Sequence, residues 1–417
     1  MRDGESWWKR LSPSAEGCGE LGQEPRRARA FRPDAASTGL EGRQLLSTVH
    51  AHIVKPKLNP QFPTLKLSTL PAPPVVGNGQ DLATGPDGNV WFTEPGVGKV
   101  GVVNTLGGSS EIPTPSGQSP TGAITAGHDG ALWFSETNQV GRVSTKGVVN
   151  EYPVDPNAKL TGIAAGPDGN VWFADSGNQK IGRITPSGVF SEFAIPQPAG
   201  VKSLSETNFH HNITAGPDGN VWFTTEAVNV KTQAVVGQIG KVTPVGDITL
   251  YKLPSSPIKH SVFAKHNPPG NTLADAITAG PDGNIWFTEH KQNGRAGIGK
   301  ITPDGQMTQF SIPSVPQGSA TPDVALAITS GPDGNLWFNM VPDNFIVSPN
   351  PAPYIGRITP AGKTTIFNIP ISTDIQGAYL AEGPESIITG PDGQLWFPSV
   401  SERFISQTGR VMATFKP

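Results

Sequence analysis

Residues 162–196 read G-I-A-A-G-P-D-G-N-V-W-F-A-D-S-G-N-Q-K-I-G-R-I-T-P-S-G-V-F-S-E-F-A-I-P, and this stretch decides the fold. Its apolar residues alternate within short runs, which are separated by the Pro, Asp, Ser and Gly residues that favour tight turns. In the first turn, proline fixes φ, aspartate can bond its own backbone, and glycine accepts a positive φ. The stretch predicts four consecutive antiparallel strands. They are expected at Ile163–Ala165, Asn170–Asp175, Ile181–Thr185 and Val189–Ile195.

The same phrase occurs seven times, and each copy contains a Trp-Phe pair. The tryptophans are Trp91, Trp133, Trp172, Trp222, Trp286, Trp337 and Trp396. A repeat of roughly 40–50 residues with strand–turn–strand content is typical of a β-propeller, whose blades are four-stranded sheets that bury each other's faces. We therefore expect an all-β fold: a seven-bladed β-propeller of four-stranded antiparallel blades over residues 62–417, with the aromatic pairs packed between blades.

An aspartate lies four residues before each of these tryptophans, within the first turn of the repeat. We interpret these aspartates as turn residues, because the turn chemistry alone explains their recurrence. They are Asp87, Asp129, Asp168, Asp218, Asp282, Asp333 and Asp392.

Composition narrows the range of partners. The net charge of −3 gives no reason to expect binding to nucleic acid or to a membrane surface. No apolar run approaches the ~20 residues that a membrane-spanning helix requires. The expected partner is a small-molecule ligand, and the expected state is a monomer.

The first 61 residues differ in kind from the repeats. Arginines are scattered among Ser, Gly, Glu and Pro with no period, which predicts a disordered tail. The tail contains the one cysteine, Cys18, and lacks the apolar core of a secretory signal. We expect a cytoplasmic protein, with export as the alternative if the start of the chain is wrongly assigned.

Two segments could complete the last blade. Thr64–Leu70 alternates like an outer strand, and Arg410–Phe415 could fill the same place. The sequence leaves both alternatives open.

Insertions indicate which end of the propeller carries the function. They fall only after the second strand or after the fourth strand of a repeat, and both connections lie at the same end of an up-and-down blade. We call this end the top face, and we expect binding or catalysis there because long loops on a rigid scaffold carry function. The insertions are Gln197–His210, Ala227–Val236, Pro254–Ala274, Ser314–Leu326 and Val341–Tyr354.

Two rings of side chains are expected to face the top. The residue before each innermost strand gives the first ring, which is Gln80, Gly122, Thr161, His211, Asp275, Leu326 and Glu385. The ends of the second strands give the other ring, which includes Glu94, Glu136, Asp175, Glu226, Glu289 and His290. From these we predict Glu385 and His211 as catalytic residues, Asp275 and Glu289 as metal ligands, and His290, Glu226 and Gln80 as substrate contacts. Carboxylates and imidazoles can bind a divalent ion or act as an acid–base pair.

The repeated W-F-T-E, I-G-R-I-T and E-F-x-I-P phrases closely resemble the streptogramin (virginiamycin B) lyase family over residues 62–417. The resemblance implies a seven-bladed propeller and an antibiotic-resistance activity that opens the ester ring of type B streptogramins. It also implies a Mg²⁺-dependent elimination, in which a histidine is the general base and the metal polarises the lactone.

This chain departs from the family pattern at the positions that matter for that reaction. Glu385 takes the place of the family's basic histidine, and Leu326 takes the place of a second histidine. The last Trp-Phe strand runs into Pro398 and Ser399 and so lacks the family's acid. The family's catalytic set is therefore not intact.

Two hypotheses follow. The first is a metal-assisted lyase that acts on a cyclic ester or another small molecule at the top face. The alternative is a non-catalytic propeller that binds a ligand or a protein with the same face. Calcium-dependent lactonases also have acidic channels, but they resemble six-bladed rings, and seven repeats argue against them.

Overall fold

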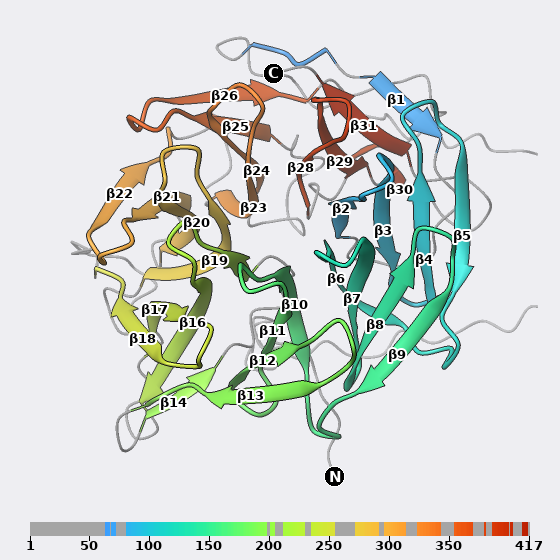
Figure 1. Cartoon of the computed structure of the whole chain (residues 1–417). Coiled ribbons are helices and arrows are strands. Elements are labelled where there is room, and N and C mark those ends of the chain that lie inside the picture. The colour runs from blue at the N-terminus through green and yellow to red at the C-terminus, as the bar shows by residue number, and fades with distance from the viewer. Residues whose placement is uncertain are drawn as a thin grey trace, which may run out of the picture. The chain divides into compact units, whose positions relative to one another are not determined.

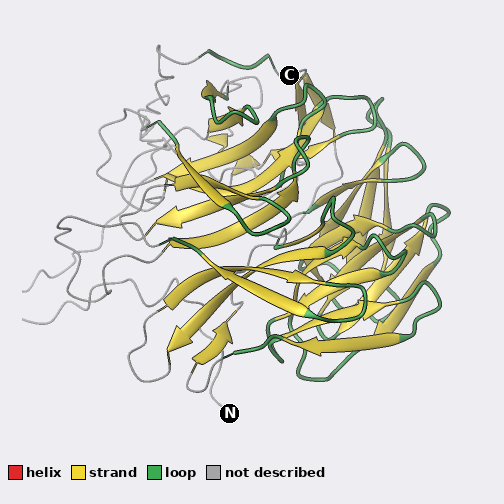
Figure 2. Cartoon of the chain, turned by 60° about the vertical axis from the view of Figure 1, so that its left-hand side comes forward, coloured by secondary structure: helices red, strands yellow, loops and turns green. Residues whose placement is uncertain are grey.

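The computed structural model describes residues 63–66, 68–71, 81–197, 201–204, 212–229, 235–254, 272–291, 296–313, 323–342, 354–369, 379–380, 386–399, 401–402 and 411–415. These residues form strands, turns and bends, and they all belong to one compact unit, Ile53–Pro417 (Figure 2). Within the described ranges no helix is long and apolar enough to span a membrane. The predicted tail, residues 1–61, lies outside them.

Five sheets each have four antiparallel strands that neighbour one another in sequence order, as the repeat predicts. We name each sheet by its second strand. The β3 sheet comprises β2 (Leu82–Thr84), β3 (Val90–Glu94), β4 (Lys99–Val103) and β5 (Ser109–Pro113). The β7 sheet comprises β6 (Pro120–Ala126), β7 (Ala131–Glu136), β8 (Gln139–Ser144) and β9 (Val149–Pro153). The β11 sheet comprises β10 (Leu160–Ala165), β11 (Val171–Asp175), β12 (Lys180–Ile184) and β13 (Phe190–Ala194). The β20 sheet comprises β19 (Thr272–Ala279), β20 (Ile285–Lys291), β21 (Ala296–Ile301) and β22 (Met307–Ser311). The β24 sheet comprises β23 (Asp323–Ser330), β24 (Leu336–Pro342), β25 (Tyr354–Ile358) and β26 (Thr364–Asn368).

The sixth four-stranded sheet joins the two ends of the propeller. It contains β28 (Ile388–Thr389), β29 (Leu395–Ser399), β31 (Val411–Phe415) and β1 (Ser68–Pro71) in that order. Strand β1 pairs with β31, which pairs with β29. The two alternatives for closing the ring are therefore both used: the C-terminal segment is the third strand and the N-terminal segment is the outer one.

The β16 sheet does not fit the prediction of four strands in every blade, because it has five. Its strands are β14 (Val201–Leu204), β15 (Ile213–Ala215), β16 (Val221–Asn229), β17 (Val235–Val242) and β18 (Ile248–Lys252). Strand β16 is nine residues long and pairs with β15 over its first half and with β14 over its second. Part of the predicted insertion Ala227–Val236 thus continues the hairpin. A separate pair is formed by β27 (Tyr379–Leu380) and β30 (Ser401–Glu402).

The sheets surround a centre, with the first strand of each repeat innermost and the fourth at the periphery (Figure 1). The core lies between sheets. Trp133 of the β7 sheet and Phe173 of the β11 sheet share one buried cluster, and Trp172 and Phe223 share the next. The prediction that the aromatic pairs pack between blades is confirmed.

This packing leaves no room for a side chain at the glycine of the I-G-R phrase. Gly182 lies opposite Phe173 in the sheet, and a Cβ at Gly182 would come within 2.1 Å of the Phe173 ring. The Phe173 ring therefore occupies the space that a side chain at position 182 would need.

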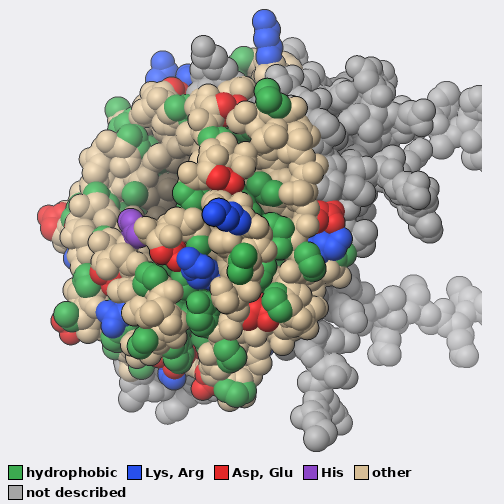
Figure 3. Space-filling view, turned by 45° about the vertical axis from the view of Figure 1, so that its right-hand side comes forward, with side chains coloured by type: hydrophobic (Ala, Val, Ile, Leu, Met, Phe, Trp, Pro, Cys, Tyr) green, Lys and Arg blue, Asp and Glu red, His purple; other side chains and the backbone are tan. Residues whose placement is uncertain are grey.

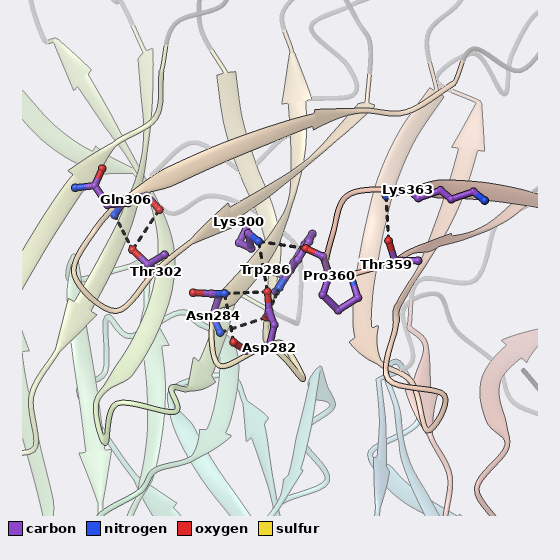
Figure 4. A network of polar contacts seen from close by, with 9 residues as sticks. All are labelled: Asp282, Asn284, Trp286, Lys300, Thr302, Gln306, Thr359, Pro360 and Lys363. Atoms are coloured by element: carbon purple, nitrogen blue, oxygen red, sulfur yellow. Dashed lines mark hydrogen bonds and ion pairs between the residues drawn. The ribbon is translucent and has the colours of Figure 1, made fainter.

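The aspartates of the first turn do more than shape the turn (Figure 4). Asp282 accepts hydrogen bonds from the backbone N of Asn284 at 3.3 Å and from the Trp286 indole at 2.9 Å. The Lys300 ammonium lies 3.5 Å from Asp282 and 5.1 Å from the Trp286 ring centroid, and it donates to the carbonyl of Pro360 in the next sheet. One turn residue thus fixes the core tryptophan and a cation that bridges two blades.

Candidate functional site

The residues of the first ring, which were expected just before each innermost strand, lie within an irregular part of that strand. In four sheets the register of this strand shifts at that position, so that the strand bulges. A bulge re-aims a side chain away from the regular alternation of a strand. The bulged positions include Gly122, Thr161, Asp275 and Leu326.

Asp275 is the most unusual acid among the described residues. Its side chain is 3% exposed, and its Oδ2 has no hydrogen-bond partner among these residues. Burial raises the pKa of Asp275 well above its usual range, and the negative charge of Glu226 adds to the increase. The backbone oxygen of Asp275 accepts a hydrogen bond of 2.9 Å from Thr224, which ties β19 to the neighbouring β16.

Glu226 faces the β20 sheet because it lies one residue further along its strand than the acids of the other repeats. Two residues after the phenylalanine of each second strand come Glu94, Glu136, Asp175 and Glu289, but here the corresponding residue is Thr225. Glu226 is one residue further along and therefore points to the opposite face of β16, the face of Trp222 and Thr224. That face packs against the β20 sheet. We call these two acids, whose charges interact across the boundary between two blades, the carboxyl pair.

Glu289 lies at the same boundary, because strand alternation places it on the face of Phe287, which packs against Trp222. It is fully buried, and its Oε1 accepts a hydrogen bond of 2.7 Å from Gln309. His290 is half-buried and points to the opposite face of β20. Glu226 and Glu289 therefore lie on the two strand faces that meet at this boundary, whereas His290 faces away from it.

The structure does not test the predicted roles of these residues, and three further predicted site residues are not described by it. Gln80, His211 and Glu385 lie outside the described residues. Across the ranges that are described, no three His, Cys, Asp or Glu side chains are arranged to hold a metal ion.

Sequence reasoning missed a buried aspartate near the axis. Asp81 accepts hydrogen bonds from Ser386 Oγ at 3.0 Å and from the backbone N of Ile124 at 3.1 Å, so that it links three consecutive sheets. Both Asp81 and Ser386 are buried. The sequence did contain a sign of this. The residue that follows each first-ring residue is polar in three repeats (Asp81, Asn212 and Ser386) but Ala or Gly in the others.

Charge is not concentrated on the side of the molecule seen in Figure 3, where acidic and basic side chains are interspersed among apolar ones. The chemistry is instead local, in buried carboxyl groups where neighbouring sheets meet. These features define an all-β propeller with buried carboxyl groups where neighbouring sheets meet.

Comparison with known proteins agrees with that class. The profile of the virginiamycin B lyase family matches residues 67–259 and 262–414, so the chain belongs to this family. The virginiamycin B lyase of Nocardia farcinica is 28% identical over 201 residues, which are 47% of this chain and 57% of that protein. The chain therefore matches little more than half the length of this curated relative.

Solved structures extend the similarity to most of the fold. A virginiamycin B lyase from Staphylococcus aureus has a TM-score of 0.59 and 26% identity, covering 85% of this chain and 99% of its own. A catalytically inactive histidine-to-alanine variant of the S. aureus enzyme, determined with quinupristin, has a TM-score of 0.57 and 25% identity, covering 84% of this chain and 99% of its own.

Proposed function

We propose that this chain is a lyase-like propeller that binds a cyclic ester or related small molecule at its top face and opens it by elimination. The observation that carries the proposal is the carboxyl pair of Asp275 and Glu226. These two acids come from neighbouring sheets, and burial together with the charge of Glu226 raises the pKa of Asp275. Acids with strongly perturbed pKa values gather at functional sites.

The Mg²⁺ that the family resemblance implies fits this pair. The unengaged Oδ2 of Asp275 and the nearby carboxyl of Glu226 offer the oxygen ligands that Mg²⁺ prefers. Asp275 and Glu226 would hold the ion. A bound ion would polarise the ester carbonyl.

The protein's own groups supply the rest of the chemistry. Elimination requires a base that removes a proton next to a carbonyl while the ester C–O bond breaks, so the product has the mass of the substrate. We assign the base to Glu385, which stands where the family phrase has histidine, with His211 as the second catalytic group. Gln80 and His290 are assigned to substrate contacts.

One observation favours the alternative of a non-catalytic binding propeller. Leu326, half-buried in the bulge of β23, stands where the family phrase has a second histidine. The acid expected two residues after the last Trp-Phe phenylalanine is also replaced, by Ser399. A ligand would then bind at the top face without being opened.

Mass spectrometry of quinupristin incubated with the protein and Mg²⁺ separates the two functions. The lyase proposal predicts an isobaric, linearised product that is lost in Glu385→Gln and strongly reduced in Asp275→Asn. Glu192→Gln, on the outer strand of the β11 sheet, is the matched control and retains activity. An intact ring at equimolar protein would overturn the lyase proposal, and calorimetric binding of quinupristin that depends on Asp275 would then support the alternative.

A further inference from the structure

The peptide unit between Asp275 and Ala276 is held at both of its polar atoms. Its carbonyl oxygen accepts a hydrogen bond of 2.9 Å from the hydroxyl of Thr224, which belongs to the neighbouring β16 sheet. Its N–H donates to the hydroxyl of Thr288 on β20, also at 2.9 Å. Both threonine side chains are buried. Because a peptide unit is planar, bonds to its oxygen and to its nitrogen together fix the orientation of its plane.

The bulge in β19 is the reason why side chains make these two bonds. Regular pairing of β19 with β20 stops after Ala274 and resumes at Ile277. The two residues between them, Asp275 and Ala276, lie opposite the single residue Thr288. An extra residue of this kind disrupts the strand ladder locally. The two threonine hydroxyls therefore bond the carbonyl and the N–H at the place where the ladder is interrupted.

The fixed plane limits the directions that the Asp275 side chain can take, since this side chain branches from the Cα atom that borders the plane. Thr224 is itself anchored, because its backbone N donates to the carbonyl of Asn212 at 2.9 Å. Strand alternation places Thr224 and Glu226 on the same face of β16. One strand thus supplies both the bond to the main chain of Asp275 and the negative charge that acts on its carboxyl group.

The β7 sheet contains the same pair of bonds without an acid. The carbonyl of Gly122 accepts a hydrogen bond of 2.8 Å from Thr93 of the neighbouring β3 sheet, and the N–H of Ala123 donates to Ser135 at 3.2 Å. This peptide unit also lies in a bulge. Glycine has no side chain to orient, so the pair of bonds has only a structural role there. The two sheets therefore provide a matched comparison.

We propose that Thr224 and Thr288 are positioning residues, which hold the Asp275 carboxyl group in the orientation that the ring-opening reaction uses. They act through the main chain of Asp275 and not by contact with the substrate. This inference rests on the proposed function, in which Asp275 is a reacting-site residue. Functional groups work best when the residues around them lock their geometry, and a displacement of about 1 Å can cost roughly 100-fold in rate.

The test compares Thr224→Val, which removes the hydroxyl and keeps the branched shape, with Thr224→Ser, which keeps the hydroxyl, and with Thr93→Val in the β3 sheet. Both valine variants should lower the thermal midpoint by a similar few degrees, because each loses one buried hydrogen bond. Only Thr224→Val should lower kcat for quinupristin opening, by about 10- to 100-fold with KM little changed. Thr224→Ser should recover most of kcat. Equal kcat values for the two valine variants would overturn the proposal.

Crystal structures of the wild type and of both Thr224 variants test the positioning role without any measurement of activity. We expect the peptide unit after Asp275 and its carboxyl group to turn in Thr224→Val and to keep the wild-type orientation in Thr224→Ser. An Asp275 that is unchanged in Thr224→Val would overturn the proposal. A wild-type protein that leaves quinupristin intact would instead overturn the proposed function, and the crystal structures would still show whether Thr224 orients Asp275.

Discussion

The aspartate in the first turn of each repeat links that turn to the core tryptophan and to a nearby cation. The aspartate of each first turn stabilises that turn and accepts a hydrogen bond from the indole of a core tryptophan. In most sheets it also lies near a cation that is stacked on that indole. Arg183 and Lys241 occupy the same place as Lys300, lying 5.5 and 5.2 Å from the centroids of Trp172 and Trp222. The turn chemistry of Asp282 could be predicted from the sequence. Its bond to Trp286 could not, because nothing in a local pattern shows on which side of the strand the indole nitrogen lies.

Replacing Asp282 with Asn tests this role and its pH dependence. Burial opposes the charge of Asp282, but hydrogen bonds from Trp286 and Asn284 and the charge of Lys300 lower its pKa below 3.8. Because the pKa of Asp282 is lower in the folded state than in the unfolded state, its charge stabilises the folded state at pH values above the unfolded pKa. This stabilisation is lost as the pH falls through the folded pKa. Urea denaturation at pH 7 should show Asp282→Asn less stable by about 1–3 kcal/mol.

The difference between wild type and Asp282→Asn should shrink below about pH 4, as Asp282 becomes protonated. Asp247→Asn, at an exposed turn, is the matched control and changes stability by less than about 0.5 kcal/mol. A difference that stays constant down to pH 3 would show that the charge of Asp282 does not matter.

At the scale of strands, the repeat predicts where each element lies but not its irregularities. The strands expected in residues 162–196 are confirmed to within a few residues at their ends. The bulge that holds Asp275 and the continuation of β16 to Asn229 were not predicted, because both depend on pairing with β20 and β14. The one-residue offset of Glu226 was readable in the sequence by counting from Phe223. That the charge of Glu226 acts on Asp275 could be seen only from the arrangement of two sheets.

Replacing Gly182 with Ala tests the packing of the Phe173 ring on the strand backbone. The new Cβ would overlap the ring, since the Cβ position lies 2.1 Å from its nearest atom. We expect a loss of about 1–3 kcal/mol in the free energy of unfolding, measured by urea denaturation. In a Phe173→Leu background the same substitution should cost less, and equal costs in both backgrounds would contradict the account.

At the scale of the whole molecule, the ring is closed by both ends of the chain. Strand β1 pairs with β31 over four residues, and the backbone of Leu65 donates to Asn368 in the neighbouring β24 sheet. The sequence left two alternatives for the outer strand because both segments alternate. Pairing between residues about 340 apart cannot be read from a local pattern.

Deleting residues 1–71 should open this closure, because it removes β1 together with Leu65, which is buried against the core. A thermal melt followed by circular dichroism should show a midpoint lower by several degrees and a broader transition. Deletion of residues 1–62 keeps every N-terminal residue that the structure describes and is the matched control. Equal midpoints for the two deletions would show that β1 does not stabilise the ring.

A crystal structure of the protein with quinupristin and Mg²⁺ tests the central claim most directly, namely that the top face carries a site built on Asp275 and Glu226. We predict ligand density at the boundary between the β16 and β20 sheets, with an ion bound to the Asp275 carboxylate and with Glu385 within reach of the ester. Density elsewhere on the propeller, or no ligand at concentrations that saturate the S. aureus enzyme, would contradict it.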